Sequence, residues 1–474
     1  NRWVRSFDFL AIAIIFRGVR RTWIWLVVPA LCGGCAIYHR TPLDHSAIKR
    51  ALRPASLGKL QVAASEIQHP LLSPIKFTPQ AGLTPDQAAV LAVLVNPSLR
   101  AARDRRGVAE AELFRAGILP NPQVSGSLDY ITGGTITPGL ITGYGFGASW
   151  DLQALIQHGA KQAAARANVQ SVDLDLAWTE WQIAQGAKLA VYRVIANEEQ
   201  LARAREVDGR LEKNLDVIRR ATEAHEQTEV DLASADSASQ DAHATVLGLE
   251  KDLADQRLAM KKAIGFPPDA TVRLRDGISL PSHVSTPSSR ELMTNLEERR
   301  LDLLALKKGY ESQEEKLRAA VLAQFPKISL GFNRASDTSN IHTLGPAVTI
   351  DLPIFDRGQG SIAFERATRQ MLRDEYFNRI FEARSDVATA LTDIRELEKQ
   401  IGAAEAAVPV LQHLVEVFRV AAGQGNVNAF EYYSAQNNLN QKTIQILKLK
   451  QQLVETRIAL ELAAGRYLPM QPNE

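Results

Sequence analysis

The stretch VTIDLPIFDRGQG, Val348 to Gly360, decides the fold of this chain. Its first part alternates apolar and polar residues as a half-buried strand does, and Pro353 ends the alternation because proline cannot donate to a sheet ladder. FDRGQG then has the composition of a turn, in which Gly358 and Gly360 permit a change of direction. A helical pattern follows from Ser361 for ~60 residues. The stretch therefore predicts a strand that turns directly into a very long helix.

A similar junction, GASWDLQALIQHG, occurs earlier, and the two belong to a tandem repeat. Asp151 recurs as Asp351 and Gly265 as Gly465, both at an offset of 200 residues. Such a constant offset is the mark of a duplicated unit. The predicted strand–helix junction residues are Asp351, Pro353, Gly358 and Gly360 in the second copy, and Asp151 and Gly159 in the first.

Each copy predicts the same order of elements: a helix, two strands and two long helices. The predicted helices are Pro97–Gly117, Ala160–Thr222 and Val230–Ile264 in the first copy, and Leu296–Gln324, Ser361–Ala422 and Asn428–Ala464 in the second. A helix of ~60 residues extends ~90 Å at 1.5 Å per residue. Such a helix must be stabilised by lateral packing, as in coiled coils.

The N-terminal part has the features of an export signal. Arg17, Arg20 and Arg21 precede the apolar run TWIWLVVPAL, and CGGC follows it. The run is shorter than the ~20 apolar residues that a transmembrane helix needs. Its end resembles a lipoprotein lipobox in which Cys35 carries the lipid. The alternative is an ordinary signal peptide, or a short anchor, with incidental cysteines.

We divide the chain at the signal, the repeats and the linker between them. The predicted segments are 1–34 (signal), 35–82 (N-terminal lipoprotein segment), 83–265 (first repeat, strands about 122–152), 266–289 (linker), 290–468 (second repeat, strands about 326–353) and 469–474 (tail).

Four predicted strands have one apolar side each. The apolar positions are Val124, Gly126, Leu128 and Tyr130; Tyr144, Phe146, Ala148, Trp150 and Leu152; Ile328, Leu330 and Phe332; and Leu344, Val348, Ile350 and Leu352. Alternation of this kind is typical of membrane β-strands, and in an exported chain we expect the apolar side to face lipid. Four strands cannot close a barrel, and lipid tolerates no open sheet edge. Three protomers would supply twelve strands, an even number within the known range.

Composition excludes several other classes of function. The formal net charge is +2 and 23% of residues are charged, so no basic field indicates nucleic acid as a partner. The two cysteines, Cys32 and Cys35, lie together, which leaves no disulfide framework and no thiolate metal site. The nine histidines have no ligand spacing, and GFG and GQG lack the lysine of a phosphate loop. We therefore expect no enzyme, no cofactor and no bound metal.

The layout resembles the TolC-type outer-membrane efflux family over roughly Leu83 to Leu468. The resemblance is carried by the repeated strand-pair and long-helix unit, by LPIFDRGQG and by GNVNAFEYYSAQNNL near the second helical tip. LPIFDRGQG is particularly similar to members that serve heavy-metal and drug exporters of the resistance-nodulation-division class. In the first copy QALIQHGAK replaces PIFDRGQG, which is a departure from the family pattern.

The resemblance implies a mainly α-helical homotrimer whose twelve-stranded barrel continues into a helical barrel across the periplasm. It would be a passive outer-membrane duct for metal ions or drugs, anchored by lipid and barrel, that works with a periplasmic adaptor and an inner-membrane pump. Two alternatives are a channel for type I protein secretion and an exported coiled-coil scaffold without a pore.

The resemblance also implies a pore constriction at the helical tips. Glu431 stands six residues after Gly425, as in the family motif, and Asp231 is its counterpart in the first copy. The family's second carboxylate, three residues on, is Ser434 here. The alternative for both acids is stabilisation of a helix N-terminus, worth ~0.3–1 kcal/mol.

Overall fold

The computed structural model describes residues 37–51, 57–78, 81–135, 138–424 and 429–468. The chain separates into two compact units, Asn1–Arg53 and Pro54–Glu474. The described part of the first unit contains α2 (His45–Ala51), which begins where the Asp44 carboxylate accepts from the Ala47 N–H at 2.8 Å. All remaining elements belong to the second unit. The predicted lipid-bearing residue, Cys35, lies outside the described residues.

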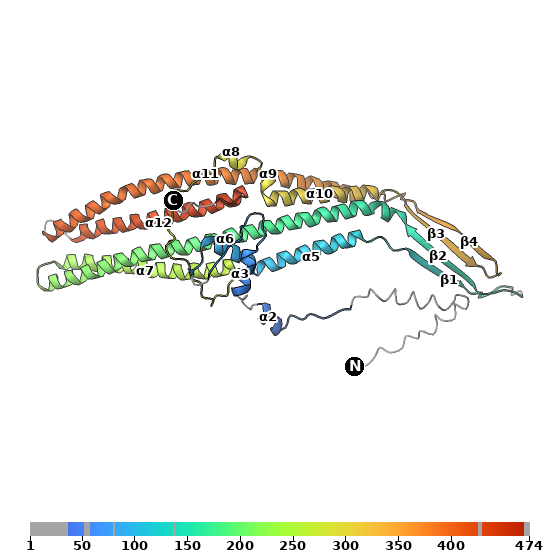
Figure 1. Cartoon of the computed structure of the whole chain (residues 1–474), viewed down its shortest axis with the longest axis horizontal. Coiled ribbons are helices and arrows are strands. Elements are labelled where there is room, and N and C mark those ends of the chain that lie inside the picture. The colour runs from blue at the N-terminus through green and yellow to red at the C-terminus, as the bar shows by residue number, and fades with distance from the viewer. Residues whose placement is uncertain (1–36, 52–56, 79–80, 136–137, 425–428, 469–474) are drawn as a thin grey trace. The chain divides into compact units, whose positions relative to one another are not determined.

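Two long helical hairpins dominate the second unit (Figure 1). The first is α6 (Leu152–Glu223, 72 residues) with α7 (Glu229–Ile264, 36 residues). The second is α11 (Gln359–Gly423, 65 residues) with α12 (Ala429–Ala464, 36 residues). At 1.5 Å per residue α6 extends about 108 Å. α6 begins eight residues before the predicted start at Ala160, because the first copy has no turn between strand and helix.

Shorter helices continue the hairpins toward the strands. α5 (Ser98–Gly117) packs on α6, and α10 (Leu301–Leu322) packs between α6 and α11. The helix predicted over Leu296–Gln324 is interrupted at Arg300, so α9 (Leu296–Arg299) precedes α10. The other short helices are α3 (Leu57–Ser65), α4 (Pro85–Val95) and α8 (Ser289–Met293).

In each copy, the end of one helix abuts the start of another and a side chain fills the junction. The Asn96 amide donates to the Ala263 carbonyl at 2.9 Å where α7 ends and α5 begins. The Arg300 guanidinium donates to the Ala463 carbonyl at 3.0 Å where α12 ends and α10 begins. These carbonyls have no partner within their own helix, so the side chains act as caps. The repeat therefore keeps one joint in two chemical versions, one neutral and one charged.

The strands form one antiparallel sheet of four strands in the order β1-β2-β3-β4. They are β1 (Gln123–Asp129), β2 (Gly143–Asp151), β3 (Lys327–Ser336) and β4 (His342–Asp351). β2 of the first copy pairs with β3 of the second, with Ala148 opposite Phe332. The strand pairs of the two copies thus form a single sheet. β1 is shorter than predicted and ends before Tyr130.

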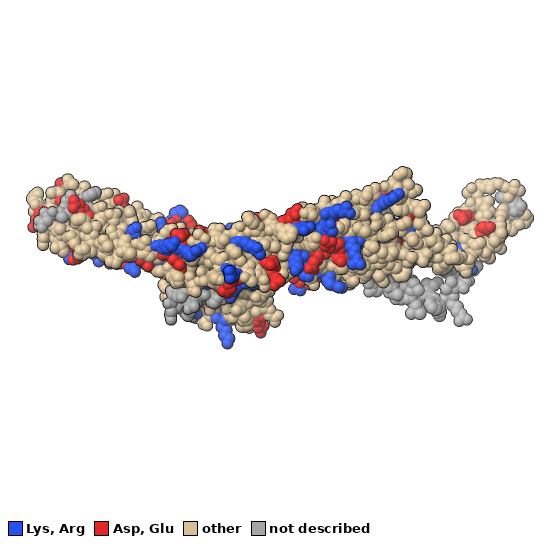
Figure 2. Space-filling view, turned by 90° about the horizontal axis from the view of Figure 1, so that it is seen from above, with Lys and Arg blue, Asp and Glu red and all other residues tan. Residues whose placement is uncertain are grey.

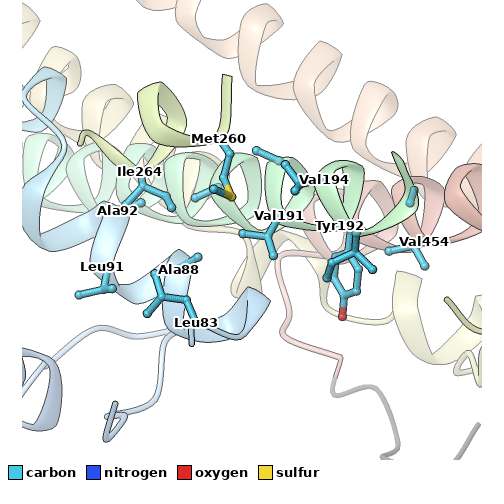
Figure 3. Close-up of a cluster of buried hydrophobic side chains, with 14 of the residues drawn as sticks. Leu83, Ala88, Leu91, Ala92, Val191, Tyr192, Val194, Met260, Ile264 and Val454 are labelled. Carbon is cyan, nitrogen blue, oxygen red and sulfur yellow. The ribbon is translucent and has the colours of Figure 1, made fainter. Parts of the chain in front are cut away.

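The main core lies where α4 packs against α6 and α7 (Figure 3). Leu91 of α4, Val191 of α6 and Met260 of α7 are all at most 2% exposed. Residues 57–78 cover this core, and Phe77 is buried in it. A second core joins α8, α11 and α12 around Ile394 and Leu453. Because residues 57–78 pack on this core, they belong to the same compact unit as the repeats.

We expect Gly465→Ala to destabilise the second joint by about 1–3 kcal/mol, the range for a strained backbone position. Gly465 has φ +59°, and an added Cβ would lie 2.7 Å from Arg300 Cγ and 3.1 Å from Arg300 Cα. The measurement is the denaturant midpoint of helix loss, followed by circular dichroism in detergent.

Gly402→Ala is the matched control, because Gly402 lies on α11 with nothing within 4 Å of the new methyl group. It should be neutral or stabilising, by about 0.5–1 kcal/mol, since alanine is the better helix former. Equal shifts of the two midpoints would show that the joint contributes nothing specific.

Candidate functional site

The register of the sheet places the apolar residues of all four strands on one face. Val124 pairs with Ala148, Trp150 with Leu330, and Leu330 in turn with Val348. The apolar face contains Val124 and Leu128; Tyr144, Phe146 and Trp150; Ile328, Leu330 and Phe332; and Leu344, Val348 and Ile350. Within the strands the apolar positions predicted from the alternation therefore lie side by side.

The large apolar side chains of this face are exposed in the single chain. Val348 is 61% exposed, Leu330 47% and Phe146 47%. The Phe146 and Phe332 rings contact each other across the β2–β3 pair, with centroids 6.5 Å apart. An exposed apolar patch of this kind marks a surface that another apolar phase or protein covers.

The opposite face of the sheet is lined by small and polar residues at close range. A Cβ on Gly147 would lie 2.6 Å from Asn333 Oδ1 and 2.8 Å from Ser125 Oγ. A Cβ on Gly331 would lie 2.2 Å from the Ala148 carbonyl oxygen. Glycine thus allows the polar side chains of neighbouring strands to crowd together on this face.

Both outer strands have an unpaired edge among the described residues. β1 pairs with β2 alone, and β4 pairs with β3 alone. Each edge presents backbone N–H and C=O groups that can extend the sheet. Figure 2 shows that charged side chains gather mainly over the helices, and that the end that carries the strands has a few acidic ones.

In the second copy, the strand passes into the helix through a loop, as predicted. β4 ends at Asp351, Pro353 follows, and α11 begins at Gln359 after Gly358. Gly358 has φ +74°, which only glycine adopts readily. Gly360 lies in the first turn of α11 and is not among the residues with positive φ. The change of direction therefore depends on Gly358, and the role predicted for Gly360 is wrong.

In the first copy, the expected turn is absent. Asp151 ends β2 and also caps α6, because its carboxylate accepts from the Gln153 N–H at 2.8 Å and the Ala154 N–H at 3.2 Å. Gly159 lies inside α6, so it makes no turn and the junction role predicted for it is wrong. The Gln153 amide donates to the carbonyls of Ala323 and Phe325, which holds this junction against the start of β3.

At the tip of the first hairpin, Asp231 caps a helix. The Asp231 carboxylate accepts from the Thr228 hydroxyl at 2.6 Å and from the Thr228 N–H at 3.2 Å, while the Thr228 hydroxyl accepts from the Asp231 N–H. This arrangement is a capping box at the start of α7. The capping role considered as the alternative for Asp231 is thus present in the structure.

At the second tip, Glu431 lies in the first turn of α12 and is exposed. Residues 425–428, which include Gly425, lie outside the described residues. Tyr433, two residues after Glu431, is buried among Val207, Leu211 and Ala235 of the first hairpin. Burial raises the pKa of Tyr433 to about 12, and the charges of Tyr432 and Asp231 add to the shift. The two tips are therefore packed together, with a neutral tyrosine between them.

A buried ionic cluster joins the two repeats, and we did not predict it. Lys188 on α6 is 2% exposed, and its Nζ lies 3.2 Å from Asp86 Oδ1 and 3.4 Å from Glu461 Oε2. The Tyr467 hydroxyl donates to Asp86 at 3.2 Å, and the Lys188 ammonium lies 5.0 Å from the Tyr467 ring centroid. Glu461 is fully buried, and its Oε1 makes no hydrogen bond within the described part of the chain. Burial raises the pKa of Glu461 more than the nearby Lys188 and Arg457 charges lower it.

A second buried cluster surrounds the charged joint. Asp302 accepts from Arg300 at 2.6 and 2.9 Å and from Arg379 at 2.9 Å. Burial raises the pKa of Asp302, but the hydrogen bonds and charges of Arg300 and Arg379 lower it further, to below its usual value. The Arg300 guanidinium also stacks on Trp178, 4.9 Å from the ring centroid. These contacts connect α6, α10 and α11 where α12 ends.

The described residues contain no group of three or more potential metal ligands. The cavities among the described residues include one of about 540 Å³ between α6, α11 and α12 and one of about 650 Å³ lined by residues 268–278. Side chains of both charges line each of these cavities.

We expect Glu461→Gln to remove part of the pH dependence of stability. A carboxyl whose folded pKa is raised stays protonated in the folded state while the unfolded chain ionises. Stability from this group is therefore full below its usual pKa of 4.5 and falls as pH rises toward the folded pKa. Glutamine is neutral throughout, so the variant should gain stability relative to the wild type as pH rises from ~4.5 to ~8. The measurement is the denaturant midpoint across that range.

Glu416→Gln is the matched control, because Glu416 is exposed and paired with Arg419 at the surface. It should not gain stability relative to the wild type as pH rises. A constant difference between Glu461→Gln and the wild type at every pH would contradict the assignment.

Comparison with known proteins gives a family match for the second repeat. Residues 292–466 match the family described as outer membrane efflux protein. No curated protein sequence matches the chain. The family match spans α9 to α12 and both strands of the second copy.

Solved structures share the fold over most of the chain. CusC is similar at 20% identity and a TM-score of 0.66, over 85% of this chain and 99% of its own. VceC from Vibrio cholerae is similar at 19% identity and 0.64, over 81% and 96%. MtrE from Neisseria gonorrhoeae is similar at 17% identity and 0.64, over 85% and 97%. The resemblance to the TolC-type outer-membrane efflux family is thus confirmed, by a family match over residues 292–466 and by the fold of solved outer-membrane efflux channels.

Proposed function

We propose that this chain is the outer-membrane channel of a tripartite efflux system, a passive duct that carries small toxic solutes, metal ions or drugs, to the exterior. The observation that carries the proposal is the apolar, exposed face of a sheet with two open edges. Lipid would cover that face, and other copies would complete those edges. The relatives described as an outer membrane channel, MtrE, and as forming a transmembrane channel, CusC, support this proposal.

The assembly that we propose is a homotrimer. β1 of one copy would pair with β4 of the next, so that three copies close twelve strands. Near the strands, α5, α6, α10 and α11 pack side by side in this order. The two outer helices, α5 and α11, both have exposed apolar side chains. On α5, Phe114 is 74% exposed, and on α11, Phe364 and Phe381 are 67% and 70% exposed. Contact between α5 of one protomer and α11 of the next would cover these phenylalanine side chains.

The C-terminal part of α11 also has exposed apolar side chains. Val410, Leu414 and Val417 recur every three or four residues and are 69%, 37% and 46% exposed. Among the described residues, α11 is the one helix that is long and apolar enough to cross a membrane by length and composition. Of the apolar stretch of 18 residues in α11 that meets this criterion, 11% is buried. We assign the stretch to helix packing within the trimer, because it lies on a helix that α12 lines over much of its length.

The long hairpins would form the periplasmic tunnel, with their tips farthest from the outer membrane. A periplasmic adaptor and an inner-membrane pump would dock there and supply cargo and energy. Asp231 and Glu431 would narrow the pore, since threefold symmetry gathers like charges into rings that concentrate cations. Cys35 would carry a lipid that anchors the chain to the outer membrane, together with the barrel.

We expect Arg at Val348, on the apolar face, to impair insertion by ~2–4 kcal/mol per protomer, the cost of a cation near the bilayer centre. Arg at the neighbouring Thr349, on the polar face, should be far milder. The measurement is the yield of assembled trimer in outer membranes at matched expression. Equal loss for both variants would mean that this sheet does not face lipid.

The tip acids are tested by removing charge while keeping hydrogen-bond acceptors. Asp231→Asn with Glu431→Gln should change conductance and reduce cation preference in single-channel recordings, because two rings of charge are neutralised. Asparagine retains the side-chain oxygen that caps α7, so trimer stability should persist.

Asp255→Asn, on the exposed side of α7 beside Lys251, is the control and should leave selectivity unchanged. If the double variant keeps wild-type selectivity, the acids act as helix caps and not as a constriction. A trimer without conductance in any variant would favour a scaffold without a pore.

A further inference from the structure

The loop between β4 and α11 exposes three apolar side chains in close succession. Leu352 is 69% exposed, Ile354 65% and Phe355 91%. Isolated apolar residues at a surface are common, but a cluster in a loop is unfavourable in water unless a partner covers it. The loop therefore has the character of a contact surface.

The backbone of this loop is held by its own polar side chains. The Asp356 carboxylate accepts from the Gly358 N–H at 2.8 Å. The Gln359 amide accepts from the Arg357 N–H at 2.7 Å and donates to the Phe355 carbonyl at 3.0 Å. Gly358 in the left-handed region fixes the exit into α11. Phe355 is thus presented on a preorganised turn, which reduces the entropy lost on binding.

The loop is continuous with the apolar face of the sheet. Leu352 and Ile354 continue the parity of Val348 and Ile350 beyond the last residue of β4. Arg357, which is exposed, lies two residues after Phe355, and the intervening Asp356 carboxylate is bound to the Gly358 N–H. An apolar projection beside a cation suits the boundary between acyl chains and phosphate headgroups.

The first copy has no equivalent loop. There Asp151 caps α6 directly, and Trp150 donates its indole N–H to the Pro120 carbonyl at 2.7 Å. A contact between the two repeats of one chain would not require only the second junction to have this loop. A contact with lipid needs only one apolar loop for each protomer. The structure thus assigns a separate role to the second junction.

We propose that Leu352, Ile354 and Phe355 insert into the bilayer interface at the strand–helix junction, with Arg357 at the level of the phosphate groups. The loop then sets how deep the sheet sits in the membrane. This inference rests on the proposed function, because it requires the apolar face of the sheet to lie in lipid.

The test is fluorescence quenching of the full chain in vesicles of phosphatidylcholine brominated either near the headgroup or near the middle of the acyl chains. Phe355→Trp is compared with wild type, which corrects for the native tryptophans. Its added emission should be quenched at least about twofold more by the shallow bromine than by the deep one.

Two further variants calibrate the measurement. Val348→Trp, in the middle of β4, should show the reverse preference. Phe381→Trp is 70% exposed in the wild type but lies 22 residues along α11, about 33 Å from its start, and should not be quenched.

The outcomes separate this inference from the proposed function. If Val348→Trp is quenched and Phe355→Trp is not, the loop lies outside the lipid and the inference is wrong, while the duct stands. Protection of that unquenched residue from aqueous acrylamide would identify a second copy as its cover. If neither variant is quenched, the sheet is not in the bilayer and both proposals fail.

Discussion

The unpaired edges of the four-stranded sheet are the constraint on which the proposed architecture depends. A backbone N–H or C=O group without a partner costs several kcal/mol in hydrocarbon, so a sheet with an apolar outer face must be closed. One chain supplies four strands, and its edges belong to different copies of the repeat, β1 to the first and β4 to the second. If other chains close the sheet, α5 of one protomer also lies next to α11 of the neighbouring protomer. The arrangement of the helices follows from the requirement on the strands.

The tandem repeat is preserved in geometry and altered in chemistry. Both copies join two helices end to end, but Asn96 makes one joint and Arg300 the other. Both copies pass from strand to helix, but only the second uses a loop. These differences let two related halves occupy different positions around one layer of helices. The charged joint, with Asp302 and Arg379, also connects α10 to α11, which the neutral joint at Asn96 does not do.

The sequence was sufficient to predict the strands and hairpins because their periods are local. Alternation with period two identified the apolar side of every strand, and the register then brought those sides together. The start of α6 was misplaced because the first junction was interpreted by analogy with the second. Asp151 is a favourable N-cap followed by helix-forming residues, which was the available signal.

The ionic clusters could not be predicted, since Lys188 and Glu461 are 273 positions apart in the chain. A weaker signal was present in α12, where Arg457 and Glu461 interrupt an apolar helix face formed by Leu453, Val454 and Ile458. Charged residues at such positions are rarely buried without partners. Which partners they have depends on packing between the two repeats, which local periodicity does not contain. The roles of Asp231 and Glu431 depend in the same way on neighbours from other chains.

The cluster around Lys188 has a consequence for how the two repeats relate to one another. Lys188 and Asp86 belong to the first repeat, whereas Glu461 and Tyr467 belong to the second. In the first repeat alone, the Lys188 ammonium group would keep Asp86 but lose Glu461 and the Tyr467 ring. In the second repeat alone, Glu461 would lose the hydrogen bond from Lys188. A buried polar group that loses a partner costs stability. The duplicated halves are therefore no longer interchangeable units, because each completes a buried cluster that the other begins.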